Sequence, residues 1–426
     1  MKLWLSFIVA LLIAVAAPAF GALYPSGGPH STDNDDSCDI ALLPAATLLL
    51  PYYEVDFGAG GKTTLFTVMN VSNTERIAHV TVLTDRSFPL LTFDLRLAPY
   101  DTRSINLYDV IVGGRIESCD GPETLSAEML ARVRKAFTTG IVPVDSRLCG
   151  SISGAGLNAA GFVTIDLVAS CTTLTLHDRA YFTDAIRFDN VLAGDYQHVD
   201  PRNGPAEGSS LVHIRAIPEG GDAGTRAVDP KYQVNFPGTF YGRYQDPAPP
   251  LDARQPLPTV FVAPWETDRR AGVATSWIIW RDVRSRDPHT CGYSEIDDGR
   301  LVFPEIVRFD DSENAIGEGV DAPPCSCLPT GPETSAAGRY ADDHFLQFED
   351  VDSGWLYFNL AEWLPSGEWR PSDPKGQAWV VASRTFGSAS TMADAVALGN
   401  GCSRPAAESE ISEGLATLGP APNINP

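Results

Sequence analysis

Residues 48–116 read LLLPYYEVDFGAGGKTTLFTVMNVSNTERIAHVTVLTDRSFPLLTFDLRLAPYDTRSINLYDVIVGGRI, and they contain the densest strand pattern in the chain. Apolar and polar residues alternate, and successive side chains of a strand point to opposite faces of a sheet. The alternation is cleanest at residues 90–97. It places Leu91, Phe93, Leu95 and Leu97 inward and Thr92, Asp94 and Arg96 outward.

Short turns separate these segments, so neighbouring strands are expected to pair antiparallel and stack as a sandwich. Pro51 interrupts the first apolar run, which is typical of an edge strand or a bulge. One helix is expected near residues 122–137, with Asp120 as its cap and Glu123 as the capping-box partner. The predicted fold class is all-β, mainly antiparallel, with two β-sandwich-like domains and this single helical excursion.

The chain has 426 residues, which is more than one ordinary core accommodates. A stretch rich in proline, glycine and charge separates two strand-rich halves. The predicted organisation is a signal peptide at 1–19, a flexible acidic arm at 20–40, an N-terminal β-sandwich domain at 41–220, a connection at 221–258, a C-terminal β-rich domain at 259–402 and a disordered tail at 403–426. Within the connection, the aromatic segment TFYGRY at 239–244 is expected to be ordered.

The first residues predict export. Lys2 precedes an apolar run at 3–17, and Ala17-Pro18-Ala19 fits the small-residue rule for cleavage, with Ala19-Phe20-Gly21 as the alternative. The run is shorter than the roughly 20 residues of a spanning helix, so we expect a cleaved leader and no membrane span after its removal. The expected location is secreted, periplasmic or at the cell surface.

Eight cysteines follow the leader, and an even number in an exported chain predicts disulfides. They are Cys38, Cys119, Cys149, Cys171, Cys291, Cys325, Cys327 and Cys402. Local placement favours Cys119 with Cys149 and Cys38 with Cys171, and the other four would pair among themselves. Eight cysteines allow 105 pairings, so the sequence alone does not assign the connectivity.

The formal net charge is −23, which disfavours nucleic-acid binding because phosphate contacts need basic patches. Acidity of this kind favours divalent cations instead. Asp33, Asp35 and Asp39 alternate along the arm, so an extended chain presents them on one side as oxygen ligands for calcium. The spacing lacks the glycine and glutamate of an EF-hand loop, and solvated acids are the simpler interpretation.

Two segments partly match enzyme motifs, but each lacks a residue that its motif requires. Gly58-Ala59-Gly60-Gly61-Lys62-Thr63 resembles the end of a phosphate-binding loop, but Asp56 stands where the motif needs glycine. Residues 150–154 have the two glycines of a nucleophile elbow, but Ile152 occupies the serine position. A catalytic triad is defined by geometry rather than by sequence, so a hydrolase remains open.

Seven of the eight tryptophans follow residue 264. Trp277 and Trp280 have opposite strand parity, so only one of them can face a given core. Trp363 and Trp369 lie in the loop LAEWLPSGEWRPSDP and are the candidates for exposed, sugar-stacking aromatics. The partners that this predicts are an extracellular glycan or protein.

Several blocks resemble an uncharacterised family of exported bacterial β-rich proteins with no established activity. They are LLPYYEVDF, TTLFTVMNVS, HVTVLTD, FDLRLAPYDTRSINLYDVIVGGRI, NVLAGDYQHVDP, SLVHIRA, TFYGRY, WIIWRD and GWLYFNL, between residues 42 and 400. The segments LTDRSFP and LAPYD depart from the family pattern. The resemblance implies export and a β-rich fold and carries no catalytic residue over.

The sequence therefore predicts a non-catalytic extracellular or cell-surface β-sandwich protein that binds or scaffolds. The alternative is an extracellular hydrolase whose site is assembled from loops.

Overall fold

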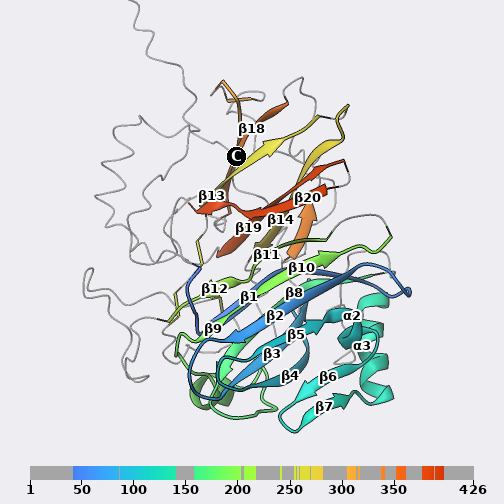
Figure 1. Ribbon diagram of the computed structural model, residues 1–426, viewed down its shortest axis with the longest axis vertical. Coiled ribbons are helices and arrows are strands. Elements are labelled where there is room, and N and C mark those ends of the chain that lie inside the picture. The colour runs from blue at the N-terminus through green and yellow to red at the C-terminus, as the bar shows by residue number, and fades with distance from the viewer. Residues whose placement is uncertain are drawn as a thin grey trace, which may run out of the picture.

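The structure is a computed structural model of the chain. It describes residues 42–85, 87–140, 158–202, 206–216, 240–241, 254–255, 257–258, 260–268, 270–281, 305–312, 315–316, 337–340, 352–360, 377–387 and 389–397. The fold is mostly β, and the recorded strand pairings are antiparallel (Figure 1). This confirms the predicted fold class.

The first half of the chain forms two five-stranded sheets and a hairpin. One sheet has the order β12 (Val212–Ile214), β1 (Thr47–Asp56), β8 (Asn158–Val168), β3 (Arg76–Thr84) and β4 (Pro89–Leu97). The other has the order β11 (Glu207–Ser210), β10 (Asp195–Val199), β2 (Thr63–Asn70) and β5 (Thr102–Asn106), and β9 (Leu192–Ala193) also pairs with β2. The hairpin consists of β6 (Arg115–Ser118) and β7 (Gly121–Thr124).

The second half forms two more sheets, above the first half in Figure 1. One has the order β16 (Ala315–Ile316), β15 (Glu305–Asp310), β18 (Ser353–Asn359), β13 (Val260–Glu266) and β21 (Val396–Ala397). The other has the order β17 (Ala337–Tyr340), β14 (Val273–Arg281), β19 (Ala378–Phe386) and β20 (Ala389–Asp394). Each sheet takes its strands from one half of the chain, whereas the domain boundaries themselves stay a prediction.

The helical excursion begins later than predicted. Residues 121–124 pair as β7, and α3 (Ala127–Thr139) starts after Ser126, whose hydroxyl accepts from the Met129 N–H at 3.1 Å. Gly140, at φ 69°, ends the helix in the left-handed conformation that glycine favours. Two short helical turns, α2 (Leu107–Ile111) and η2 (Tyr181–Ala185), complete the helical segments among the described residues.

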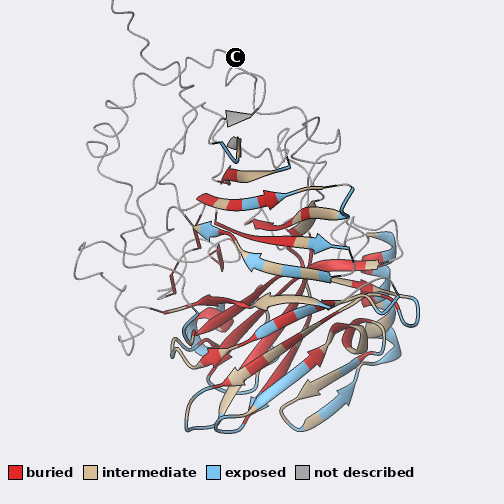
Figure 2. Cartoon of the chain, turned by 45° about the horizontal axis from the view of Figure 1, so that its top comes forward, coloured by how far each residue is buried: buried red, intermediate tan, exposed pale blue. Residues whose placement is uncertain are grey.

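Strand β1 lies between β12 and β8, but β12 pairs only with its first three residues, Thr47 to Leu49. Its pairing with β8 shifts between Leu50 and Tyr53, so Pro51 lies at an irregularity of the bulge type, beyond the residues that pair with β12. The strands of this sheet contain long buried stretches, drawn red in Figure 2. Such runs are expected where both faces of a sheet are covered.

The two faces of this sheet pack against different partners. One face contributes Leu50, Val80 and Ile165 to a core shared with Phe66 and Tyr196 of the facing sheet. The opposite face contributes to a second core that continues into the other half of the chain. That core includes Leu49 and Phe162 from the first half and Trp280, Ala337 and Val381 from the second.

Trp277 and Trp280 lie on opposite faces of β14, as their parity predicts, and their rings contact different halves of the chain. The Trp277 ring meets Phe358 of β18 edge to face, with centroids 6.3 Å apart. The Trp280 ring meets Phe162 of β8 at 5.7 Å and Phe240 at 4.9 Å. Strand β14 is therefore buried on both faces, and the face with Trp280 packs against the first half.

Candidate functional site

The buried acid Asp166 lies on the face of β8 that is turned away from the first core. Its Oδ1 accepts from Thr47 Oγ1 at 2.6 Å and from Arg254 at 3.0 Å. Its Oδ2 accepts from Tyr181 Oη at 2.7 Å and from Tyr241 Oη at 2.9 Å. We refer to Asp166, Thr47, Tyr181, Tyr241 and Arg254 as the Asp166 cluster.

Every member of the Asp166 cluster is buried, so its charges lie in a medium of low dielectric constant. An ion pair is tolerated there only when hydrogen bonds satisfy its remaining polar atoms. Burial, followed by the Asp166 charge, raises the pKa of both Tyr181 and Tyr241 well above the ordinary range, so both phenols stay protonated and donate. Both carboxylate oxygens therefore have donors already, which suits a structural role better than that of a general base.

Arg254 and Tyr241 belong to the segment that connects the two halves. The Arg254 guanidinium lies 4.2 Å from the centroid of the Tyr241 ring, a cation–π arrangement. The amide Oε1 of Gln377 accepts from the N–H of Phe240 at 3.2 Å and of Leu257 at 2.9 Å. These contacts fix the described parts of the connection between β8 and the second half.

A second polar contact joins the halves at Glu207 of β11. Its Oε1 pairs with Arg339 of β17, and its Oε2 accepts from Ser383 Oγ at 2.5 Å and Ser390 Oγ at 2.6 Å. We refer to these four residues as the Glu207 cluster. Burial alone raises the pKa of the Glu207 carboxyl, but Arg339 and the serine hydroxyls outweigh it and hold that pKa below its usual value.

Next to the Glu207 cluster, β10 turns His198 and Tyr196 inward. His198 Nδ1 lies 2.9 Å from Thr64 Oγ1, and the two rings of β10 meet edge to face at 5.3 Å. Burial, reinforced by the Arg339 charge, lowers the pKa of His198 to about 3. His198 is therefore neutral at physiological pH, and within the described ranges its Nε2 has no hydrogen-bond partner.

A His–Asp pair lies on the neighbouring strands β3 and β4, of which β4 is an edge strand of the sheet that contains β8. His79 Nδ1 is 2.7 Å from Asp94 Oδ1, and the Thr172 N–H donates to Asp94 Oδ2 at 2.8 Å. Asp94 is thus buried, although the alternation of β4 predicts that it faces outward. The error arises because Thr172 and Cys119, from other parts of the chain, lie against this carboxylate, which the pattern of β4 itself cannot show.

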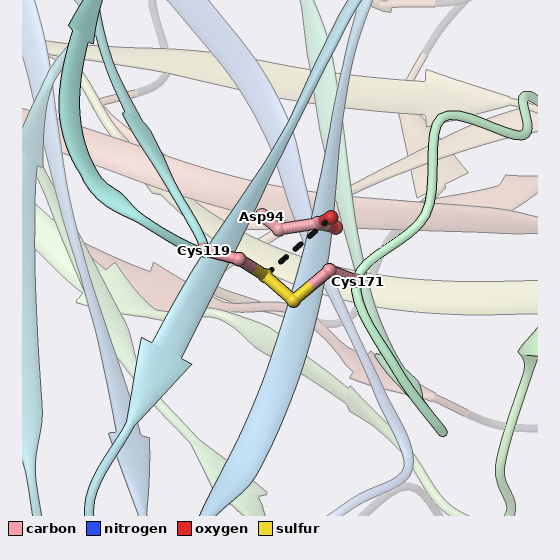
Figure 3. Close-up of side chains that lie close together, drawn as sticks. All are labelled: Asp94, Cys119 and Cys171. Carbon is pink, nitrogen blue, oxygen red and sulfur yellow. Dashed lines mark hydrogen bonds between the residues drawn. A yellow bond between two sulfur atoms is a disulfide. The ribbon is translucent and has the colours of Figure 1, made fainter.

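Asp94 also lies beside a disulfide, as Figure 3 shows. Its Oδ2 is 3.9 Å from Cys119 Sγ, and Cys119 is bonded to Cys171. The three residues lie close enough together to resemble a metal site. Both sulfurs are already in the disulfide, however, so neither is a thiolate ligand.

The Cys119–Cys171 disulfide corrects two predicted pairings, Cys119 with Cys149 and Cys38 with Cys171. Proximity along the chain favoured the first, whereas the sheet brings residue 119 next to residue 171, 52 positions away. The other six cysteines, Cys38, Cys149, Cys291, Cys325, Cys327 and Cys402, lie outside the described residues. Their pairing stays a prediction.

The predicted ligand-binding residues also lie outside the described residues. These are Trp363 and Trp369 for a glycan, and Asp33, Asp35 and Asp39 for calcium. The structure therefore leaves both as predictions. Of the tryptophans that it describes, Trp265, Trp277, Trp280 and Trp379 are buried, and Trp355 stacks on Phe309 with centroids 3.9 Å apart.

Sequence reasoning missed both polar clusters. Arg254 lies in a proline-rich connection and Glu207 in a short strand, and neither position shows a local pattern that marks a buried charge. The available signal was the aromatic segment at 239–244, which was expected to be ordered and which supplies Phe240 and Tyr241. Arg254 meets Asp166 across 88 residues and Ser390 meets Glu207 across 183, and contacts at such separations leave no local trace in the sequence.

Comparisons with known proteins found no matching family model, no matching curated protein and no matching solved structure. Among the described residues, no helix is long and apolar enough to cross a membrane. The functional interpretation therefore depends on the geometry of this chain.

Proposed function

We propose that the protein is an exported, non-catalytic extracellular or cell-surface module whose two joined sandwiches bind or scaffold a partner outside the cell. The observation that carries the proposal is the use of its buried charges. In the Asp166 and Glu207 clusters, both carboxylates have donors on both oxygens, and many of those donors come from the connection or the second half. Such groups favour a fixed relative position of the two halves.

A fixed arrangement of two sandwiches suits binding or scaffolding because it places loops far apart in sequence on one rigid frame. The apolar core that continues from Phe162 to Trp280 supports the same interpretation. A bacterial cell surface or secreted fraction is the location that the leader and the family resemblance favour. The Cys119–Cys171 disulfide is in keeping with an oxidising compartment.

A loop-built hydrolase is the second candidate, and the His79–Asp94 pair is the observation that favours it. A catalytic histidine is oriented by a carboxylate in this way. His79 is fully buried, however, and its Nε2 has no hydroxyl or thiol partner among the described residues. A nucleophile and a route for substrate would both have to come from elsewhere.

The proposal is tested by two parallel measurements on the purified, leader-free protein. Washed cells and culture fluid of the producing organism are incubated with tagged protein, and retention is compared with a tagged protein of equal charge. A fluorophosphonate probe and panels of ester, peptide and glycoside substrates test for turnover. We expect saturable retention without labelling or turnover. Turnover that is lost in a folded His79→Gln variant would establish the hydrolase instead.

A further inference from the structure

The loops at one end of the first sandwich are braced by a single buried side chain, Asn70. Its Nδ2 donates to the carbonyl of Thr74 at 2.7 Å, of Ala98 at 2.9 Å and of Leu97 at 3.4 Å. Its Oδ1 accepts from the N–H and the hydroxyl of Ser72, at 2.9 and 2.7 Å. The β2–β3 loop and the β4–β5 loop are thereby tied together. Because this amide is buried and fully used, the Asn70-Val71-Ser72 sequon is a poor site for glycosylation.

Tyr100 is presented to solvent by this braced pair of loops. Its backbone is left-handed, with φ 59°, a conformation in which a bulky residue is strained and glycine is not. The Tyr100 N–H donates to the Ser72 carbonyl at 3.2 Å, and the residue is 71% exposed. A large aromatic residue therefore occupies a strained position where it packs little of its own surface. Retained strain of this kind indicates a function for the side chain.

The charges around Tyr100 occur as pairs. Arg103 Nε is 3.1 Å from Asp101, and Arg96 Nη1 is 3.2 Å from Glu75. Arg76 likewise pairs with Asp189 at 3.0 Å. The surroundings therefore offer hydrogen-bond donors and acceptors without the strong negative charge of the chain as a whole. A ligand that fits them is polar and uncharged.

We propose that this surface, defined as Val71 to Glu75 with Ala98 to Asp101, binds a neutral glycan, with the sugar ring stacked on Tyr100. An exposed aromatic ring offers its face to the C–H groups of a saccharide, and the flanking ion pairs offer partners for its hydroxyls. A protein partner fits less well. On these loops only Tyr100 and Val71 are large exposed apolar residues, too few for the apolar centre of a protein interface.

This inference rests on the proposed function and names the ligand class. It is tested with the leader-free protein on an array of neutral oligosaccharides built from hexoses, pentoses and N-acetylhexosamines, with uronic-acid oligomers as the charged control. Three variants are compared with the natural chain. Tyr100→Phe keeps the ring, Tyr100→Gly removes both the ring and the strain, and Tyr108→Phe is a matched tyrosine control in α2.

We expect neutral-glycan binding that Tyr100→Phe and Tyr108→Phe retain and that Tyr100→Gly weakens by about tenfold or more. Because glycine relieves the strain, Tyr100→Gly should leave the melting temperature unchanged or raise it by about 1–3 °C. Loss of binding together with unchanged or higher stability excludes unfolding as the cause.

Three results would overturn the inference: no hit on neutral glycans, hits that Tyr100→Gly leaves intact, or Tyr100-dependent capture of a protein with no glycan signal. The proposed function has a separate outcome. If the array is blank while cells or culture fluid still retain the Tyr100→Gly variant, the glycan surface is wrong and the binding function stands. If nothing retains the natural chain either, both fail.

Discussion

The Asp166 and Glu207 clusters use the same chemistry at different depths. Each places a carboxylate of the first half among hydroxyl and guanidinium donors. The Asp166–Arg254 pair is sealed from solvent, with side chains 0% and 1% exposed, whereas Arg339 in the Glu207 cluster is 28% exposed. Because the energy of an unpaired charge rises as water is excluded, depth should decide how much each cluster contributes to stability.

The largest effect is expected when Arg254 is replaced by methionine. Arg254→Met leaves the Asp166 charge buried with three neutral donors, which should lower the free energy of unfolding by about 3–5 kcal/mol in denaturant titrations. Arg254→Met combined with Asp166→Asn removes the uncompensated charge and should recover part of that loss. A loss below about 1 kcal/mol for the single variant would mean that the burial of this cluster does not determine its contribution to the free energy of unfolding.

Lowering the pH should destabilise the protein through His198, the buried histidine next to the Glu207 cluster. The pKa of His198 is about 3 in the folded chain and close to 6.5 when unfolded, so only the unfolded chain takes up this proton between those values. The contribution of His198 to the free energy of unfolding is therefore fully present above pH 6.5. It falls as the pH drops, by about 2–3 kcal/mol at pH 4.5.

The matched variant for the acid experiment is His198→Gln, which removes the titrating group. Its unfolding free energy should fall less between pH 6.5 and 4.5 than that of the natural chain. Asp394 acts in the opposite direction, because burial raises the pKa of its carboxyl, and this contribution is common to both proteins. Equal pH slopes in the two proteins would contradict the assignment to His198.

A smaller effect is expected for Glu207→Gln. The amide still accepts from the serine hydroxyls but no longer pairs with Arg339, which is partly hydrated. The free energy of unfolding should fall by about 1–2 kcal/mol, less than for Arg254→Met. A larger loss than at Arg254 would reverse the order that depth predicts, and urea titrations of both variants under one buffer condition decide the question.

The strands were predictable because their pattern is local. Leu91, Phe93, Leu95 and Leu97 are buried as their alternation indicates, and the bulge lies at Pro51. Alternation reports which side of a strand a residue occupies and says nothing of what covers that side. Alternation therefore predicts that Asp94 faces solvent, although Thr172 and Cys119 contact its carboxylate and the residue is buried.

The candidate site was less predictable because it depends on distant pairings. Cys119 bonds to Cys171 rather than to Cys149, and Asp166 meets Arg254 across 88 residues. The apolar spacing near 122–137 predicts the helix, but residues 121–124 pair in a hairpin, and Ser126 rather than Asp120 caps the helix. Local signals identify elements, and only the assembled fold shows which charges they bring together.

The contacts between β8 and β14 predict that the two halves unfold as one unit, which thermal unfolding measures. All tryptophans after Trp4 lie beyond residue 264. In a protein that lacks residues 1–19, tryptophan fluorescence therefore reports the second half and, through Trp280, its contact with Phe162 of the first half, whereas calorimetry reports both halves in full. We predict a single calorimetric transition whose midpoint coincides with the fluorescence midpoint. Two calorimetric transitions, with fluorescence following only one of them, would show that the halves unfold independently and that the contacts between β8 and β14 do not couple them.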